Sequence, residues 1–193
     1  MGRRRRDTTS EHRSEEGNSR DDCSKFVVDS MRELGCKSGL ALDVPSGEGR
    51  HSRLLARYGM QVVSADLDIE SLKRGVSQSS REFGDRLWSV RVDAMANLPF
   101  RAEQFDLVIV VHFQLTDLVE KLIRLIKPDG LLILESYGAH GENWRTLPKV
   151  GEIAEMLASS FTIVHYKESQ LRRQPLRVTL RAVARKNVRN FAA

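Results

Sequence analysis

Two kinds of hydrophobic pattern follow one another along this chain. Short runs of apolar residues, about four to eight long, are typical of buried strands, whereas apolar residues repeated every three or four positions are typical of amphipathic helices. The patterns predict strands at 40–44, 61–66, 87–93, 107–111, 131–134, 161–166 and 176–184. They predict helices at 24–34, between the turn at 45–49 and Gly59, and at 69–78, 115–126 and 149–157.

The order of these elements indicates the fold class. Strand and helix alternate up to the sixth strand, which is the order of parallel strands joined by crossover helices. The seventh strand follows the sixth without a helix between them, so we expect it to be antiparallel. The sequence therefore predicts an α/β fold in three layers, with a Rossmann-like, doubly wound sheet of seven strands. We expect the polar segment 135–144 to form a loop.

The turn after the first strand is the first candidate site. It contains Pro45, Ser46, Gly47 and Gly49 and follows the strand-ending acid Asp43. Glycines accept positive φ angles and allow a ligand to approach the backbone, and the following helix would direct its first N–H groups at that ligand. The dinucleotide pattern G-x-G-x-x-G is not met, because no glycine lies three residues beyond Gly49. A tight turn without a ligand is the alternative.

Aspartates end three successive strands, at Asp43, Asp66 and Asp93. Carboxyl ends of parallel strands meet at one edge of a sheet, where ligands of such folds bind. Asp66 follows Asp43 by 23 residues, close to the roughly 20-residue spacing at which an acid binds ribose hydroxyls. An N-cap role for the next helix is the alternative, and Asp68 is better placed for it.

The motif Asp43-Val44-Pro45-Ser46-Gly47-Glu48-Gly49-Arg50-His51-Ser52 resembles the first motif of class I S-adenosylmethionine-dependent methyltransferases. It is most similar to the tellurite-resistance and thiopurine-type enzymes that methylate small molecules. Leu98-Pro99-Phe100 and Ile126-Lys127-Pro128-Asp129-Gly130 are similar to later methyltransferase motifs, although Asp129 stands where glycine is common. The resemblance implies S-adenosyl-L-methionine as cofactor and a small-molecule methyl acceptor. It implies cofactor contacts from Asp43, Pro45, Ser46, Gly47, Gly49, Asp66, Leu67, Asp93, Ala94 and Val111, with Asp93 and Ala94 at the adenine.

Methyl transfer needs the acceptor, the methyl group and the sulfur held in line, and a base only where the acceptor is protonated. His112, directly after the fourth predicted strand, is the best-placed base, and Tyr137 and His140 come next. A packing role for His112 is the alternative, and His51 is expected to be structural. Two further hypotheses stay open, an RNA methyltransferase and a methyltransferase-like binding module without activity.

Length and composition indicate the number of domains and the expected compartment of the protein. Its 193 residues suffice for one ordinary domain, which we place at 23–193 after a disordered polar tail at 1–22. No apolar run is long enough to cross a membrane, and no signal peptide is expected. The two cysteines have no partners at metal-binding spacing, so we expect a reduced, cytoplasmic setting without a metal. The oligomeric state stays open.

The net charge of +5 is concentrated near the C-terminus. Residues 165–193 contain eight Lys or Arg and one Glu, whereas 1–22 contain six bases and six acids. Such a basic segment makes nucleic acid a possible partner. We favour the alternative, a solvated edge strand kept soluble by arginines.

Overall fold

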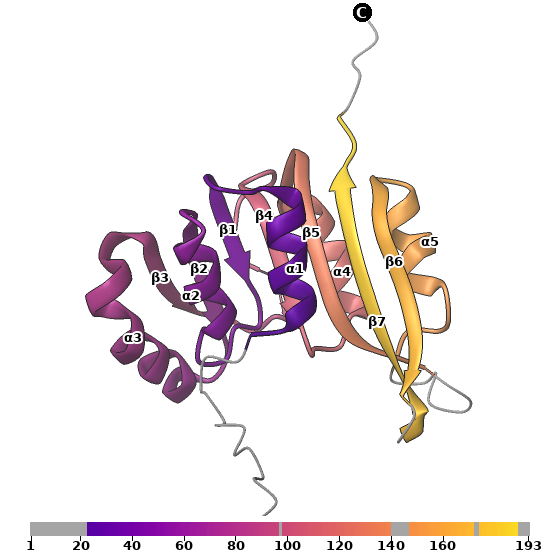
Figure 1. The fold of residues 1–193 in the computed structure, drawn as a ribbon, viewed down its shortest axis with the longest axis horizontal. Coiled ribbons are helices and arrows are strands. Elements are labelled where there is room, and N and C mark those ends of the chain that lie inside the picture. Colours follow the sequence, from indigo (N-terminus) through magenta and orange to yellow (C-terminus); the bar gives the residue numbers. More distant parts are fainter. Residues whose placement is uncertain (1–22, 97, 140–146, 172–173, 189–193) are drawn as a thin grey trace, which may run out of the picture.

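The computed structural model describes residues 23–96, 98–139, 147–171 and 174–188. Its strands form one sheet in the order β3-β2-β1-β4-β5-β7-β6, and all neighbours are parallel except that β7 is antiparallel to both β5 and β6 (Figure 1). The strands are β1 (Leu40–Asp43), β2 (Gln61–Asp66), β3 (Leu87–Arg91), β4 (Phe105–Val111), β5 (Ile126–Ala139), β6 (Phe161–Leu171) and β7 (Gln174–Lys186). The helices are α1 (Lys25–Leu34), α2 (Arg50–Arg57), α3 (Ile69–Phe83), α4 (Thr116–Leu125) and α5 (Glu152–Ala158), with a short 3-10 turn η1 (Gly84–Arg86). The predicted fold class is confirmed.

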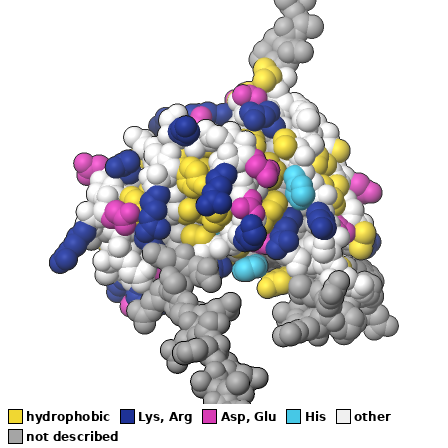
Figure 2. Space-filling model, in the orientation of Figure 1, with side chains coloured by type: hydrophobic (Ala, Val, Ile, Leu, Met, Phe, Trp, Pro, Cys, Tyr) yellow, Lys and Arg dark blue, Asp and Glu magenta, His cyan; other side chains and the backbone are white. Residues whose placement is uncertain are grey.

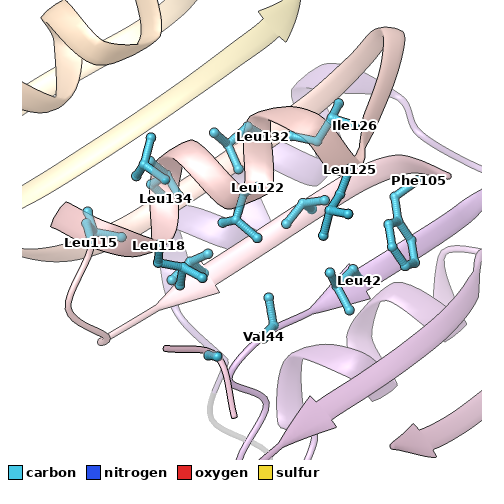
Figure 3. Packing of buried hydrophobic residues seen from close by; sticks show 14 of the residues in the cluster. Leu42, Val44, Phe105, Leu115, Leu118, Leu122, Leu125, Ile126, Leu132 and Leu134 are labelled. Carbon is cyan, nitrogen blue, oxygen red and sulfur yellow. The ribbon is translucent and has the colours of Figure 1, made fainter. Parts of the chain in front are cut away.

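Each face of the sheet has its own hydrophobic core. On one face, α1 and α2 pack on alternate residues of the central strands, such as Leu107 and Ile109. On the other face, α4 and α5 pack on the residues between them, such as Val108 and Val110 (Figure 3). Because the central strands are buried on both faces, their sequences are continuous apolar runs.

Helix ends follow the signals in the sequence. Ser24 caps α1 by accepting a hydrogen bond from the Val27 N–H, and Gly35 ends that helix at a φ of 63°. Asp68 caps α3 by accepting a hydrogen bond from the Glu70 N–H. These caps satisfy backbone groups that have no partner within the helix. Asp68 therefore has the N-cap role that was the alternative for Asp66.

Several predictions about the elements were wrong. Strand β6 continues five residues beyond Tyr166, to Leu171, and β5 begins five residues before Leu131, at Ile126. Helix α3 continues five residues beyond Gln78, to Phe83. The expected loop at 135–144 is strand as far as Ala139, because Glu135–Ala139 pair with β7 in register. Strand β7 lies between β5 and β6 and is not an edge strand. The charged side chains of β7 therefore have a neighbouring strand on each side.

No helix in the described parts of the chain is long and apolar enough to cross a membrane. The predicted tail at 1–22 and the third candidate base, His140, lie outside the described residues.

Candidate functional site

The turn after β1 is tied to the neighbouring strand by backbone hydrogen bonds. The Ser46 N–H donates to the Ala65 carbonyl over 2.9 Å, and the Gly49 N–H donates to the Ser46 carbonyl over 3.0 Å. The Val44–Pro45 peptide bond is cis. Gly49 is the N-cap of α2, so the turn delivers the chain directly into a helix whose first N–H groups face the carboxyl edge of the sheet.

The two glycines of the turn serve different purposes. Both have positive φ angles, 55° at Gly47 and 72° at Gly49. A Cβ at Gly49 would lie 3.3 Å from the Ser64 hydroxyl, so this glycine allows the turn to pack on β2. A Cβ at Gly47 would meet nothing within 4 Å. Gly47 therefore leaves its backbone accessible to a ligand without serving internal packing.

Asp66, at the end of β2, holds this turn from the side. Its carboxylate accepts hydrogen bonds from the Gly47 N–H over 2.6 Å and from the Asp68 N–H over 2.9 Å, one on each oxygen. A carboxylate oxygen has two lone pairs, so each oxygen can accept one further bond. The partly exposed Asp66 thus retains acceptor capacity for hydroxyl groups.

Asp43, at the end of β1, lies beneath the turn and is only 1% exposed. Its carboxylate accepts a hydrogen bond from the Ser52 hydroxyl over 2.6 Å. Burial raises the pKa of Asp43 to about 7, because a charged carboxylate is poorly solvated there, and the Ser52 hydrogen bond offsets only part of this effect. The charge of Asp43 is therefore sensitive to pH near neutrality.

A cavity of about 350 Å³ opens above the turn. It lies at the carboxyl ends of β1 and β4, the two strands between which the strand order reverses, and ligands of open α/β sheets bind at this position. Its lining consists of Pro45, Ser46, Gly47, Glu48, Arg50, His51, Val111 and His112. Five of these residues were predicted site residues. Glu48 and Arg50 lie in or directly after the predicted turn but had no predicted role, and His51 was predicted to be structural.

His51 connects the cavity to α1. Its ring Nε2 accepts a hydrogen bond from the Ser24 N–H over 3.0 Å. Burial, together with the nearby Arg50 and His112, lowers the pKa of His51 to about 3. The ring is therefore neutral at physiological pH, as an acceptor must be. The structural role predicted for His51 fits this contact.

The two predicted catalytic side chains lie against each other at the end of the site. The His112 and Tyr137 rings are stacked, with centroids 5.5 Å apart and an angle of 9° between their planes. His112 has a φ of 57°, and its N–H donates to the Glu135 carbonyl over 2.7 Å. This backbone bond fixes the turn at the end of β4 and places the His112 ring at the cavity.

Glu135 was missed by sequence reasoning. It is 4% exposed, receives a hydrogen bond from the Ser24 hydroxyl and forms a 2.7 Å ion pair with Arg181. The available signal was a charged residue directly after the apolar run 131–134, where a parallel strand reaches the ligand-binding edge. Because this segment was predicted to be a loop, Glu135 was not recognised as a residue near the end of a strand.

Asp93 and Ala94, predicted at the adenine, and Leu67, predicted to contact the cofactor, lie outside the cavity lining. Asp93 is exposed, and its carboxylate accepts a hydrogen bond from the Met95 N–H over 2.8 Å. Ala94 is buried, and Leu67 is 52% exposed. All three follow β2 or β3 at the same edge of the sheet as the cavity. Among the described His, Cys, Asp and Glu residues, no group is arranged to hold a metal ion.

Comparison with known proteins shows what this chain is similar to. A family model described as a methyltransferase domain matches residues 42–134. The Burkholderia thailandensis 1,6-didemethyltoxoflavin-N1-methyltransferase, solved with 1,6-didemethyltoxoflavin and S-adenosylhomocysteine, is similar at 21% identity and a TM-score of 0.65, over 84% of this chain and 77% of that one. A Methanosarcina mazei S-adenosylmethionine-dependent methyltransferase is similar at 16% identity and a TM-score of 0.64, over 82% and 97%.

A third solved structure is the Haemonchus contortus phosphoethanolamine N-methyltransferase 2, in complex with phosphomonomethylethanolamine and S-adenosylhomocysteine. It has 17% identity and a TM-score of 0.72, over 84% of this chain and 52% of that one. A comparison with curated protein sequences found no match. The domain match and the fold support a class I S-adenosylmethionine-dependent methyltransferase, whose cofactor is S-adenosyl-L-methionine.

Proposed function

We propose that this methyltransferase transfers the methyl group of S-adenosyl-L-methionine to a small-molecule acceptor, and that the cavity above the β1 turn is the site of transfer. The observation that carries the proposal is the position of Gly47. Its backbone is accessible from the cavity, and its N–H is oriented by Asp66, the acid proposed to bind the ribose.

Each predicted cofactor residue has a proposed role. Pro45, Ser46, Gly47 and Gly49 hold the amino-acid end of the cofactor, and Asp43 supports the turn from below. Asp66 accepts hydrogen bonds from the ribose hydroxyls, and Val111 forms the wall at the end of β4. Leu67, Asp93 and Ala94 bind the adenine, with the exposed Leu67 side chain as an apolar surface for the ring.

The acceptor side is proposed to lie at His112 and Tyr137. S-adenosyl-L-methionine supplies an activated methyl group, so these residues mainly position the acceptor and exclude water. His112 takes a proton from the acceptor where the acceptor carries one. Tyr137 holds the His112 ring by stacking on it.

Two features support a small acceptor. The ligands bound by two similar structures, 1,6-didemethyltoxoflavin and phosphomonomethylethanolamine, are small molecules. The cavity, about 350 Å³, has the size of small-molecule sites. The likeness of the first motif to the tellurite-resistance and thiopurine-type enzymes agrees with this class of acceptor.

The RNA alternative loses support from the basic segment itself. Arg181 is paired with Glu135, and Arg185 with Asp129 over 3.2 Å. Lys186 is buried and donates to two carbonyl groups at the end of α4. Arg185 and Lys186 are engaged within the protein and Glu135 neutralises part of the charge of Arg181, so the segment presents less free charge than its composition indicates.

Calorimetric titration with S-adenosyl-L-methionine and S-adenosylhomocysteine tests the cofactor site. We expect micromolar binding by the wild type and a loss of at least about tenfold in affinity for Asp66→Ala. Asp68→Ala is the matched control, because it removes a neighbouring carboxylate that caps α3. No binding at millimolar ligand, or equal losses in the two variants, would contradict the proposed site.

A screen of small metabolites with isotopically labelled methyl donor identifies the acceptor. Once it is known, His112→Ala should lower kcat about 10²-fold if the acceptor is protonated. A methylated RNA in place of a metabolite would transfer the assignment to the RNA alternative.

A further inference from the structure

One row of residues crosses four strands from the cavity to the edge of the sheet. Val111, Glu135, Arg181 and Lys167 are register partners on β4, β5, β7 and β6. Register partners point to the same face of a sheet, and neighbouring strands are about 4.8 Å apart. Arg181 therefore lies roughly 10 Å from the cavity wall at Val111, and Lys167 roughly 14 Å.

A second row lies one step nearer the carboxyl edge. It consists of Tyr137, Thr179 and Ser169, which are again register partners. These three side chains point to the same face as the first row, because residues two apart on a strand share a face. We call Glu135, Arg181, Lys167, Tyr137, Thr179 and Ser169 together the acceptor face.

The charges of the acceptor face are unbalanced. Lys167 and Arg181 are direct cross-strand neighbours, with Cβ atoms about 5 Å apart, and like charges in this position destabilise a sheet. Glu135 is the carboxylate of the face, and it is engaged by Arg181 and by the Ser24 hydroxyl. Lys167 has no ion pair among the described residues. An anion bound between Lys167 and Arg181 would relieve their repulsion.

The acceptor face is partly open to solvent: Lys167 is exposed and Arg181 is half-buried, whereas Glu135 is buried. Helix α1 lies over β5, where Phe26 contacts both Arg181 and His165, and the helix on the β6–β7 side, α5, lies behind the sheet (Figure 1). Lys and Arg side chains gather on the visible face over the β5–β7 region (Figure 2). Ser24 connects this patch to the cavity, because its hydroxyl bonds Glu135 and its N–H bonds His51 in the cavity lining.

We propose that the acceptor face binds an anionic group of the methyl acceptor, a carboxylate or a phosphate, roughly 10 to 14 Å from the cavity wall at Val111. This inference rests on the proposed function and specifies its substrate class. Arg181 and Lys167 bind the anion, and the hydroxyls of Thr179 and Ser169 donate further hydrogen bonds. Glu135 holds the Arg181 guanidinium in place and so acts as a positioning residue.

Anion binding can be measured without knowing the acceptor. Inorganic phosphate and benzoate are titrated into the protein saturated with S-adenosylhomocysteine, for the wild type, Lys167→Met, Arg181→Met and Arg185→Met. Arg185 is the matched control, since it lies on the same strand, is 42% exposed like Arg181, and pairs with Asp129. Lys167→Met leaves the buried Glu135 its partner, so its effect does not depend on the stability of Arg181→Met.

We expect the wild type and Arg185→Met to bind at least one of the two anions at millimolar concentration. Lys167→Met and Arg181→Met should bind it at least about tenfold more weakly. Equal affinities in all four proteins, or no anion binding by the wild type, would refute the inference. Phosphate and benzoate distinguish a phosphate group from a carboxylate.

Turnover gives a second readout. Phenol, thiol and amine acceptors are compared in pairs that differ only in a carboxylate or a carboxamide. We expect the acids to be preferred, and Lys167→Met to raise KM for the acid alone.

Equal methylation of acids and amides would end this inference and leave the proposed function intact. Absence of cofactor binding would instead remove the proposed function. Tight single-stranded RNA binding with steep salt dependence, lost in Lys167→Met, would replace the small anion by RNA.

Discussion

Exchange of Asp43 for Asn should change how the stability of the protein depends on pH. The pKa of Asp43 is raised from 3.8 to about 7 by burial at the end of β1. The folded state therefore keeps the proton that the unfolded state releases near pH 4. The stabilising contribution of this bound proton is fully present below about pH 4 and is lost as the pH rises through about 7.

The size of this effect follows from the shift. Each pKa unit corresponds to 1.36 kcal/mol, so ionising Asp43 lowers the free energy of unfolding by about 4 kcal/mol between pH 4 and pH 8. Asparagine of nearly the same shape keeps an acceptor for the Ser52 hydroxyl and does not titrate. Asp43→Asn should thus gain stability relative to the wild type by about 4 kcal/mol over this range.

Urea unfolding at pH 4, 5.5, 7 and 8 measures this difference directly. Asp85→Asn is the matched control, because it removes an exposed carboxylate in the turn before β3. Its profile should run parallel to that of the wild type. Parallel profiles for Asp43→Asn and the wild type would refute the reasoning, since they would mean that burial leaves the acidity of Asp43 unchanged.

Three further changes should separate the roles of other residues. Gly47→Ala and Gly35→Ala place alanine at φ angles of 55° and 63° and should each lower stability by about 1 kcal/mol in urea unfolding, but only Gly47→Ala should weaken cofactor binding in calorimetry. Equal binding by both variants would exclude a ligand at the turn. The wild type should lose stability on the order of 2 kcal/mol between pH 7 and pH 5, because the pKa of His51 is lowered to about 3 and its stabilisation is lost as the pH falls below 6.5. His51→Gln should not show this loss. A difference that stays constant over this range would show that His51 is solvated. Lys186→Met should lower the urea midpoint, with a loss of about 1–3 kcal/mol, because two carbonyl groups at the end of α4 lose a charged donor. An unchanged midpoint would mean that water replaces that donor.

The cofactor half of the site is readable from the sequence because its information is local. A strand, a glycine turn and a helix follow one another within 40–57, and the strand-ending acids Asp43 and Asp66 are found from the apolar runs before them. Even the choice between Asp66 and Asp68 as N-cap could be made from position in the helix. The structure confirms Asp68 as the cap, and Asp66 is left in contact with the turn.

The errors have a common cause in contacts between distant segments. Glu135–Ala139 carry polar and glycine residues that favour a loop, but pairing with β7, 38 to 46 residues later in the chain, makes them strand. The place of β7 in the middle of the sheet likewise depends on which strands it pairs with. Sequence periodicity indicates which face of a strand is buried, but it does not indicate which strand pairs with it.

Dependence on strand pairing also explains why the acceptor side of the site was not predictable from the sequence. It indicates that the proposed acceptor specificity is encoded in the pairing of β7. Lys167, Arg181 and Glu135 are separated by 14 and 46 residues along the chain, yet one register row brings them together beside Val111. The antiparallel β7 is what creates this row, because it inserts Arg181 between β5 and β6. A one-residue shift in the register of β7 would turn Arg181 to the opposite face and replace it with Leu180 or Ala182. The charge of the acceptor face, and with it the proposed preference for anionic acceptors, is thus a property of strand pairing that no single segment carries.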